Sequence, residues 1–164
     1  MTINVRPFQI GDWPFVQVIY QQGIDTKNAT FQKKAKTWAE WDNTALQECR
    51  LVATDGNIVV GWAALSAVSS RRVYAGVAEV SVYVSPKHQG KGVGKKLLSA
   101  LVTESEKSGI WTLQAVIFPE NKVSIVLHEK CGFKIVGLRE KLGQMDNTWR
   151  DVVLMERRSK AVGV

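Results

Sequence analysis

The chain has 164 residues, 45% of them hydrophobic, which suits one domain with a sizeable core over residues 1–157, followed by a short basic tail at 158–164. No apolar run reaches the roughly 20 residues of a membrane helix, and the N-terminus has the pattern of a strand instead of a signal peptide, so we expect a cytoplasmic protein without a membrane partner. The formal net charge of +7 is spread along the chain without a nucleic-acid-binding motif, and the two cysteines lack metal-ligand spacing, so neither nucleic acid nor metal is expected.

The N-terminal third predicts a strand, two helices and the loop between them. Asp12 is expected to cap the first helix, and Thr37 with Glu40 three residues later forms a capping box for the second. The expected elements are a strand at 3–6, a helix at 12–22, a loop with Thr30 and Phe31, and a helix at 37–48.

The middle of the chain predicts a hairpin and then a long strand. Asp55-Gly56-Asn57 is a strong turn signal between strands at 51–54 and 58–66. A loop at 69–72 follows, and the alternating run that ends at Val84 reads as a strand that Pro86 stops.

Glycines at alternate positions, Gly90, Gly92 and Gly94, separate this strand from an amphipathic helix that runs to about residue 107. Glycines allow a tight turn with backbone N–H groups pointing inward, and the helix adds unpaired amides and a partial positive charge at its N-terminus. Lysines at 91, 95 and 96 add positive charge. The segment therefore predicts a phosphate or pyrophosphate site, although it fits neither the Walker loop nor the dinucleotide fingerprint.

The C-terminal third predicts a strand at 111–117, a helix at 121–130, and a hairpin of strands at 133–142 and 145–157 around Gly143. Strands that alternate with helices in the middle of the chain, flanked by hairpins, predict an α/β (α+β) domain with a mixed sheet covered by helices.

The pattern Gln89-x-x-Gly92-x-Gly94, between a strand and a helix, resembles the acetyl-CoA pyrophosphate loop of the GCN5-related N-acetyltransferases (GNAT). The later Asn121-x-x-Ser124 turn and the helix after it are similar to the next part of that family. Glu79 before the Val-Tyr-Val strand, paired with His128, is similar to the branch of phosphinothricin and methionine sulfoximine acetyltransferases. The similarity covers nearly the whole chain.

The resemblance implies a GNAT fold, with a mostly antiparallel sheet of about seven strands that splays between the fourth and fifth strands. It implies acetyl-CoA as co-substrate and a homodimer. A bulge near the end of the fourth strand would free backbone N–H groups around residues 82–84 for the thioester carbonyl. The residues expected to bind the cofactor are Val82, Tyr83, Val84, Gln89, Gly90, Lys91, Gly92, Val93, Gly94, Lys95, Asn121, Ser124 and Lys130.

Acetyl transfer to an amine requires a neutral amine, so a base must remove a proton from it. Glu79 is the candidate base because it interrupts an apolar run, where the alternative is a solvent-facing carboxylate at an edge. His128 could donate a proton, orient the acyl group or bind substrate, and the alternative is a structural helix histidine.

For the acceptor, we expect an amino acid or analogue whose carboxylate suits a guanidinium fork. Arg71 best matches the branch pattern, with Arg72 close by and with Phe31 and Tyr74 as walls of the cleft. The alternative is a pair of solvated loop arginines.

Two other functions stay open. One is an acetyl-CoA-dependent enzyme whose acceptor is a polyamine, an aminoglycoside or a protein N-terminus. The paired arginines of the acceptor loop favour an anionic acceptor and argue against a cationic one. The other is a CoA-binding or nucleic-acid-binding module without turnover, against which the presence of both Glu79 and His128 argues.

Overall fold

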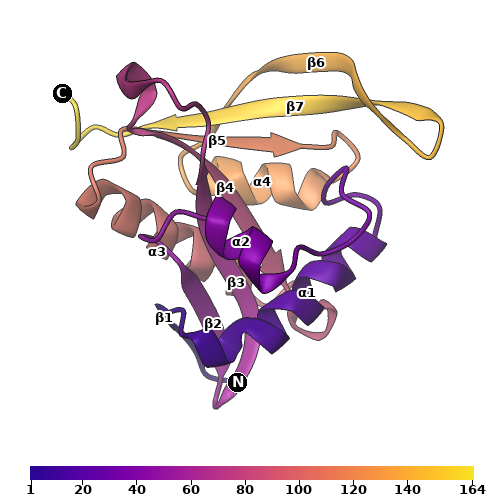
Figure 1. The fold of residues 1–164 in the computed structure, drawn as a ribbon, viewed down its shortest axis with the longest axis vertical. Helices are drawn as coiled ribbons and strands as arrows, with labels where there is room; N and C mark the ends of the chain where they lie inside the picture. Colours follow the sequence, from indigo (N-terminus) through magenta and orange to yellow (C-terminus); the bar gives the residue numbers. More distant parts are fainter.

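The computed structural model describes all 164 residues, and its centre is a seven-stranded sheet with helices packed on both faces (Figure 1). The strand order is β1-β2-β3-β4-β5-β7-β6, and every neighbouring pair is antiparallel except β4 and β5. The mixed, mostly antiparallel sheet that the sequence predicts is therefore confirmed. The strands are β1 (Ile3–Pro7), β2 (Leu51–Asp55), β3 (Ile58–Ala67), β4 (Val77–Val84), β5 (Thr112–Ile117), β6 (Lys134–Met145) and β7 (Thr148–Arg158).

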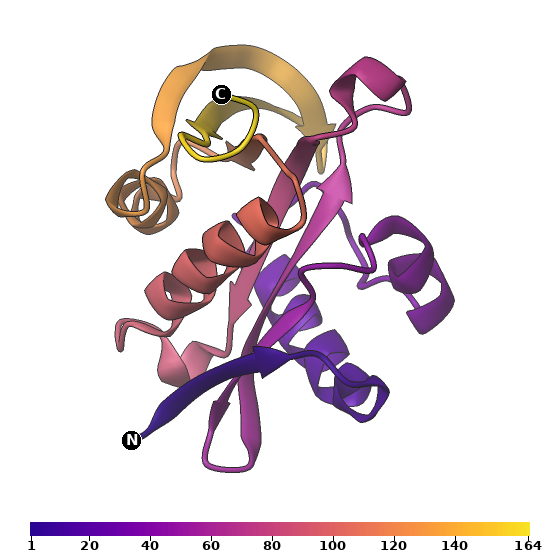
Figure 2. The ribbon, with the colours of Figure 1, turned by 90° about the vertical axis from the view of Figure 1, so that its left-hand side faces the viewer.

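Four helices cover the sheet: α1 (Trp13–Asp25), α2 (Trp38–Thr44), α3 (Val93–Lys107) and α4 (Lys122–Lys130). Helix α1 packs on β3 and β4 from one side, and α3 packs on β1 to β4 from the other, as Figure 2 shows. The apolar stripe of α3, with Leu97, Leu98 and Leu101 fully buried, forms one core, and an aromatic cluster around Trp41 and Trp62 forms the second. These two cores hold β4 rigidly between α1 and α3.

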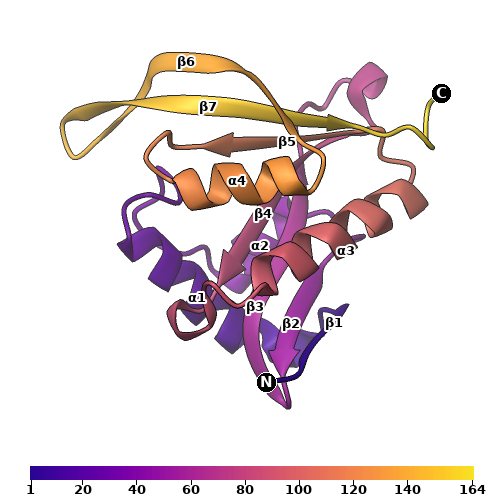
Figure 3. The ribbon, with the colours of Figure 1, turned by 180° about the vertical axis from the view of Figure 1, so that it is seen from behind.

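Strands β6 and β7 form a long hairpin that extends past the end of β5 (Figure 3). The prediction that its turn lies at Gly143 is wrong. The turn is formed by Asp146 and Asn147, with φ of 49° and 64°. A two-residue hairpin turn that matches the twist of its strands needs positive φ at both positions, and Asp and Asn tolerate this conformation. Gly143 instead pairs with Arg150 in the ladder. A Cβ added there would lie 2.9 Å from the ring of Phe31, so glycine makes room for that ring.

Helix α2 begins as predicted but ends four residues early. Thr37 and Glu40 form the expected capping box, with each side chain accepting the other's backbone N–H. The predicted end at Glu48 is wrong because the helix stops at Thr44. The buried Arg50, just beyond the helix, donates to the carbonyls of Asp42, Ala45 and Leu46, so its side chain satisfies carbonyl groups at and after the end of the helix.

Helix α1 continues three residues beyond its predicted end at Gln22, to Asp25. Asp12 precedes it as expected, but its carboxylate does not cap it. That carboxylate accepts from the guanidinium of Arg6 at 2.8 and 2.9 Å and from the backbone N–H of Gln9. The hydrogen bond from Arg6 holds the pKa of Asp12 below its usual value.

Strand β7 runs one residue into the predicted tail, and the residues after it fold back. Arg158 donates to the carbonyls of Ser159, Val162 and Gly163, and Ser159 is buried. None of the helices is long and apolar enough to cross a membrane.

Candidate active site

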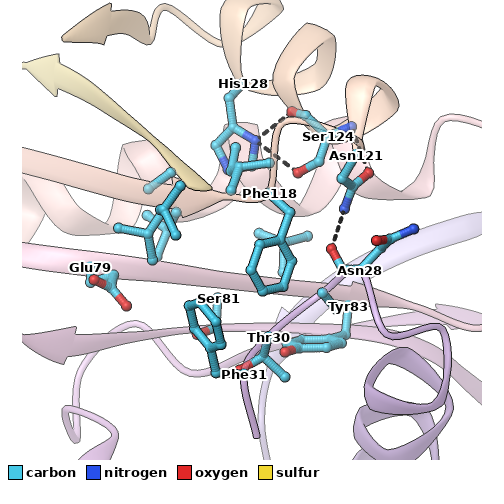
Figure 4. Close-up of a pocket in the computed structure, with 17 residues that line it drawn as sticks. Asn28, Thr30, Phe31, Glu79, Ser81, Tyr83, Phe118, Asn121, Ser124 and His128 are labelled. Atoms are coloured by element: carbon cyan, nitrogen blue, oxygen red, sulfur yellow. Dashed lines mark hydrogen bonds between the residues drawn. The ribbon is translucent and has the colours of Figure 1, made fainter. Parts of the chain in front are cut away.

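Strands β4 and β5 pair over only three residues, Val77–Glu79 with Thr112–Gln114, and then separate. This confirms the predicted splay. A cavity of about 170 Å³ opens where they part (Figure 4). Its lining comes from the loop after α1, from β4, from β5, from the connection between β5 and α4 and from α4, with one residue of β7: Asn28, Ala29, Thr30, Phe31, Glu79, Val80, Ser81, Val82, Tyr83, Ala115, Val116, Ile117, Phe118, Asn121, Ser124, His128 and Val152.

The backbone of β4 faces this cavity at alternate residues. Ser85 donates to the carbonyl of Val60 on β3, and backbone groups alternate in direction along an antiparallel pair. Val82 and Val84 therefore direct their N–H and C=O groups away from β3, toward the side where β5 has departed. The backbone of Tyr83 points to β3 instead, so its amide is not a free donor.

The expected bulge in β4 is absent, because the register between β3 and β4 is unbroken from Ala78 to Val84. The amides of Val82 and Val84 are free instead because β5 separates from β4 after Glu79. The ring of Tyr83 stacks on Trp62, with centroids 4.9 Å apart and planes 11° apart, and burial raises the pKa of its hydroxyl. Tyr83 thus forms an apolar wall.

The glycine-rich loop between β4 and α3 has the conformation of an anion cradle. Gly90 and Gly92 take φ of 74° and 81°, and a Cβ added at either would meet no atom within 4 Å. The first backbone N–H of this helix to reach a carbonyl is that of Lys96, to Gly92, so the amides of Val93, Gly94 and Lys95 stay free. Open space over three free amides at a helix N-terminus fits the pyrophosphate of acetyl-CoA.

Two of the three lysines near this loop are free to attract a phosphate. Lys91 and Lys95 have no side-chain partner, and the side chain of Lys91 is exposed. The ammonium of Lys96 instead donates to the carbonyl of Ile3 at 3.1 Å and so ties α3 to β1. The Gln89 amide turns back to the carbonyl of Val84 at 3.4 Å and closes the loop onto the end of β4.

Glu79 is the last residue of β4 that pairs with β5, and it lines the cavity at the point where the two strands separate. Its Oε1 accepts a hydrogen bond of 2.9 Å from Nε2 of Gln114, the residue opposite it on β5. No other hydrogen bond or ion pair reaches the carboxylate, so Oε2 is available to a molecule in the cavity.

His128 is 5% exposed and lies across the cavity, on α4. Its Nδ1 lies 2.7 Å from the carbonyl oxygen of Ser124, which can only accept, so Nδ1 carries a proton. Burial lowers the pKa of the imidazole, and the ring stacks edge-on against Phe133. The histidine is therefore neutral at neutral pH, with the lone pair on Nε2.

The loop from α1 closes the cavity opposite β5. Phe31 and Phe118 meet edge-on, with centroids 4.9 Å apart. Asn121 was expected to contact the cofactor, but both ends of its amide are used internally. Its Oδ1 caps α4 by accepting from Ser124 N–H, and its Nδ2 donates to the carbonyl of Asn28, as Figure 4 shows.

Val84 and the loop at 89–95 lie next to the cavity lining, at the end of β4, and four further predicted site residues lie outside both the lining and this loop. Arg71, Arg72 and Tyr74 lie on the exposed connection between β3 and β4, where the guanidinium of Arg71 lies 5.5 Å from the ring of Tyr74. Lys130 is exposed at the end of α4. The cavity lining contains no lysine or arginine.

Residues 16–133 match the Acetyltransferase (GNAT) family. The chain belongs to this family. It is 31% identical to the L-methionine sulfoximine/L-methionine sulfone acetyltransferase of Pseudomonas aeruginosa, over 95% of this chain and 94% of that protein. It is also 31% identical to the phosphinothricin N-acetyltransferase of Streptomyces viridochromogenes, over 94% and 87% of the two chains.

A solved structure supports the assignment of this chain to the GNAT family. The crystal structure of a phosphinothricin acetyltransferase from Sinorhizobium meliloti in complex with acetyl-CoA superposes with a TM-score of 0.87 at 30% identity. The match covers 99% of this chain and 91% of that one. The predicted superfamily, the phosphinothricin and methionine sulfoximine branch, and an N-acetyltransferase that uses acetyl-CoA are therefore confirmed.

Sequence reasoning did not identify several residues that build this site. Ser81 could have been found, because it alternates with Glu79 and Tyr83 along β4 and so shares their face. Gln114 and Phe118 could not, since only the pairing of β4 with β5 and the fold of the α1 loop place them beside Glu79 and Phe31.

Proposed function

We propose that this GNAT enzyme acetylates the α-amino group of a small amino acid or analogue, of the phosphinothricin or methionine sulfoximine type. One observation carries the proposal: β4 and β5 part around a small cavity that holds Glu79 and His128 beside free backbone amides. The relatives named for such acceptors align over nearly the full chain.

The loop from Gln89 to Lys95 holds the pyrophosphate of acetyl-CoA through its free amides and the helix N-terminus. The backbones of Val82 and Val84 offer the pantetheine arm the strand pairing that β5 no longer provides, and their N–H groups are the donors available to the acetyl carbonyl oxygen. When bound, acetyl-CoA supplies an acetyl group activated as a thioester.

Glu79 acts as the general base that accepts a proton from the acceptor's ammonium, directly or through one water. Gln114 holds one oxygen of its carboxylate, which turns the other toward the cavity. This contact fixes the orientation of the carboxylate, so that one oxygen stays available to accept a proton.

His128 serves as a hydrogen-bond acceptor. Its Nδ1 proton is fixed on the carbonyl of Ser124, so its free Nε2 can accept from an amine N–H and orient the attacking nitrogen. Because the neutral form dominates at neutral pH, donation of a proton from His128 is the least favoured of the roles that the sequence left open.

We predict that Arg71→Ala weakens recognition of the acceptor's carboxylate or phosphinate by a few kcal/mol, as expected for a lost hydrogen bond between charged groups. The measurement is kcat/KM for an amino acid and for its carboxamide, in wild type and variant, with acetyl-CoA affinity as the control. Wild type should prefer the free acid strongly and the variant should not. If the variant keeps the preference, recognition lies elsewhere.

Because no arginine or lysine lines the cavity, we propose that Arg71 reaches it from a second copy of the chain, in the expected homodimer. The test mixes two variants that each have low activity toward the free acid, Glu79→Gln and Arg71→Ala. Mixed dimers regain one intact site if the arginine acts across the interface and none if it acts within its own chain. A monomer in sedimentation analysis contradicts this arrangement.

The proposed acceptor class is tested by thiol release from acetyl-CoA with a panel of amines. Methionine sulfoximine, phosphinothricin and free amino acids should support turnover, whereas polyamines, aminoglycosides and a peptide N-terminus should not. Preference for a cationic amine would contradict the proposal, and the absence of any turnover would favour a binding module. A cytoplasmic location stays a prediction.

A further inference from the structure

The wall of the cavity that faces the acceptor is a loop without regular structure. Residues 26–37 join α1 to α2, and Asn28, Ala29, Thr30 and Phe31 line the cavity. Such a segment has no ladder of backbone hydrogen bonds to fix it, so its position depends on contacts from other elements.

Asn121 makes one of these contacts, a hydrogen bond to the carbonyl of Asn28, and Arg150, on β7, makes two more. Its guanidinium donates to the carbonyl of Lys27 at 2.7 Å and to Oδ1 of Asn28 at 2.9 Å. The same group pairs with the carboxylate of Glu120, 3.2 Å away, in the connection just before α4. The side chain of Arg150 is only 13% exposed, whereas that of Glu120 is 60% exposed, so water partly screens the ion pair while the guanidinium stays in a fixed place.

Arg150 also fixes the aromatic part of the wall. Its guanidinium carbon lies 3.9 Å from the centroid of Phe118, a residue that is 4% exposed and that meets Phe31 edge-on. One planar cation thus connects β7, the residue after β5, the segment before α4 and the α1 loop, which suits the fixed fork of arginine.

We propose that Arg150 is a positioning residue that holds the Asn28–Phe31 wall against Phe118 and thereby sets the affinity of the enzyme for its acceptor. The inference rests on the proposed function, because it assigns this wall to the acceptor. Arg150 itself is not part of the cavity lining and touches the acceptor only through the residues it holds.

The chain contains a matched control. Arg50 is buried, pairs with Asp42 at 2.7 Å, donates to three backbone carbonyls and lies 4.8 Å from the ring of Trp41. It therefore makes the same kinds of contact as Arg150, but around α2 and away from the cavity. Loss of either arginine removes a comparable set of interactions, and only one set borders the acceptor wall.

The experiment compares Arg150→Met with Arg50→Met. We expect kcat/KM for the acceptor to fall about 10- to 100-fold in Arg150→Met, mainly through KM, because a small displacement of a substrate wall has effects of this size. KM for acetyl-CoA should stay within about twofold of wild type, and Arg50→Met should change neither value beyond about twofold. Similar acceptor KM values in the two variants would overturn the proposal.

Hydrogen exchange tests the same wall without turnover. Amides of residues 26–31 should exchange about tenfold faster in Arg150→Met than in wild type, and at the wild-type rate in Arg50→Met. Unchanged exchange in Arg150→Met shows that the wall does not depend on this arginine and contradicts the inference. If wild type accepts no amino acid, the proposed function fails, but exchange still decides whether Arg150 holds the wall.

Discussion

Gly92→Val is expected to lower acetyl-CoA affinity by about 100-fold or more while the protein stays folded. Gly92 has a φ of 81°, which a β-branched residue avoids. Valine would therefore change the backbone conformation so that the loop amides no longer point toward the same phosphate. The new side chain would also enter the open space above the free amides of the α3 N-terminus. Loss of two hydrogen bonds to a charged phosphate, at about 1.5–3 kcal/mol each, accounts for the expected change.

Calorimetric titration with acetyl-CoA measures this effect, and Gly56→Val is the control. Gly56 has a φ of 60° and equally open surroundings, but it lies in the turn between β2 and β3. Both variants should lose similar thermal stability, and only Gly92→Val should lose affinity. Unchanged affinity in Gly92→Val would place the cofactor elsewhere, and an equal loss in Gly56→Val would attribute the effect to strain.

Local signals predicted much of this fold. The capping box of Thr37 and Glu40, the Asp55-Gly56-Asn57 turn and the strand, glycine loop and helix around Gly92 each involve residues close in sequence. The free amides of the cofactor loop follow from the same local geometry. For that reason the phosphate site could be placed before the sheet was known.

The errors lie where a side chain outside the predicted element, or a turn pair other than glycine, decides the local structure. Helix α2 stops at Thr44 because Arg50 takes carbonyl groups at its end, and the helical pattern of 37–48 contains no sign of this. The β6–β7 turn was placed at Gly143 because glycine is the usual turn residue, yet Asp146 and Asn147 form the turn and Gly143 accommodates Phe31.

In the candidate site, too, some residues could be recognised from the sequence and others only from the fold. Glu79 stands out in the sequence as a carboxylate in an apolar strand, and His128 by its place in the family pattern, and both line the cavity. The partners that orient them do not stand out. Gln114 reaches Glu79 only because β4 and β5 pair up to that residue, and Arg150 reaches Asn28 across 122 positions of the chain.

Glu79→Gln is expected to keep acetyl-CoA affinity and to lose about 10²–10⁴ in turnover, the usual contribution of a positioned base. The substitution preserves the volume of the side chain at the apex of the cavity, so the walls should keep their places. It removes the only carboxylate in the cavity lining, so the acceptor enters as an ammonium without the base that takes its proton. Near-normal turnover of a folded variant at neutral pH would exclude Glu79 as the base.

The pH dependence of the loss separates a base from a binding group. Above about pH 8, α-amino groups are increasingly neutral in solution, and a neutral amine needs no base before it attacks. The deficit of Glu79→Gln should therefore shrink as the pH rises, approaching wild-type kcat where the acceptor is mostly neutral. Gln114→Leu, which keeps the carboxylate but frees its held oxygen, should show a smaller deficit at neutral pH. A deficit in Glu79→Gln that stays constant from pH 7 to 10 would mean that Glu79 binds or orients the acceptor and that the proton leaves by another route.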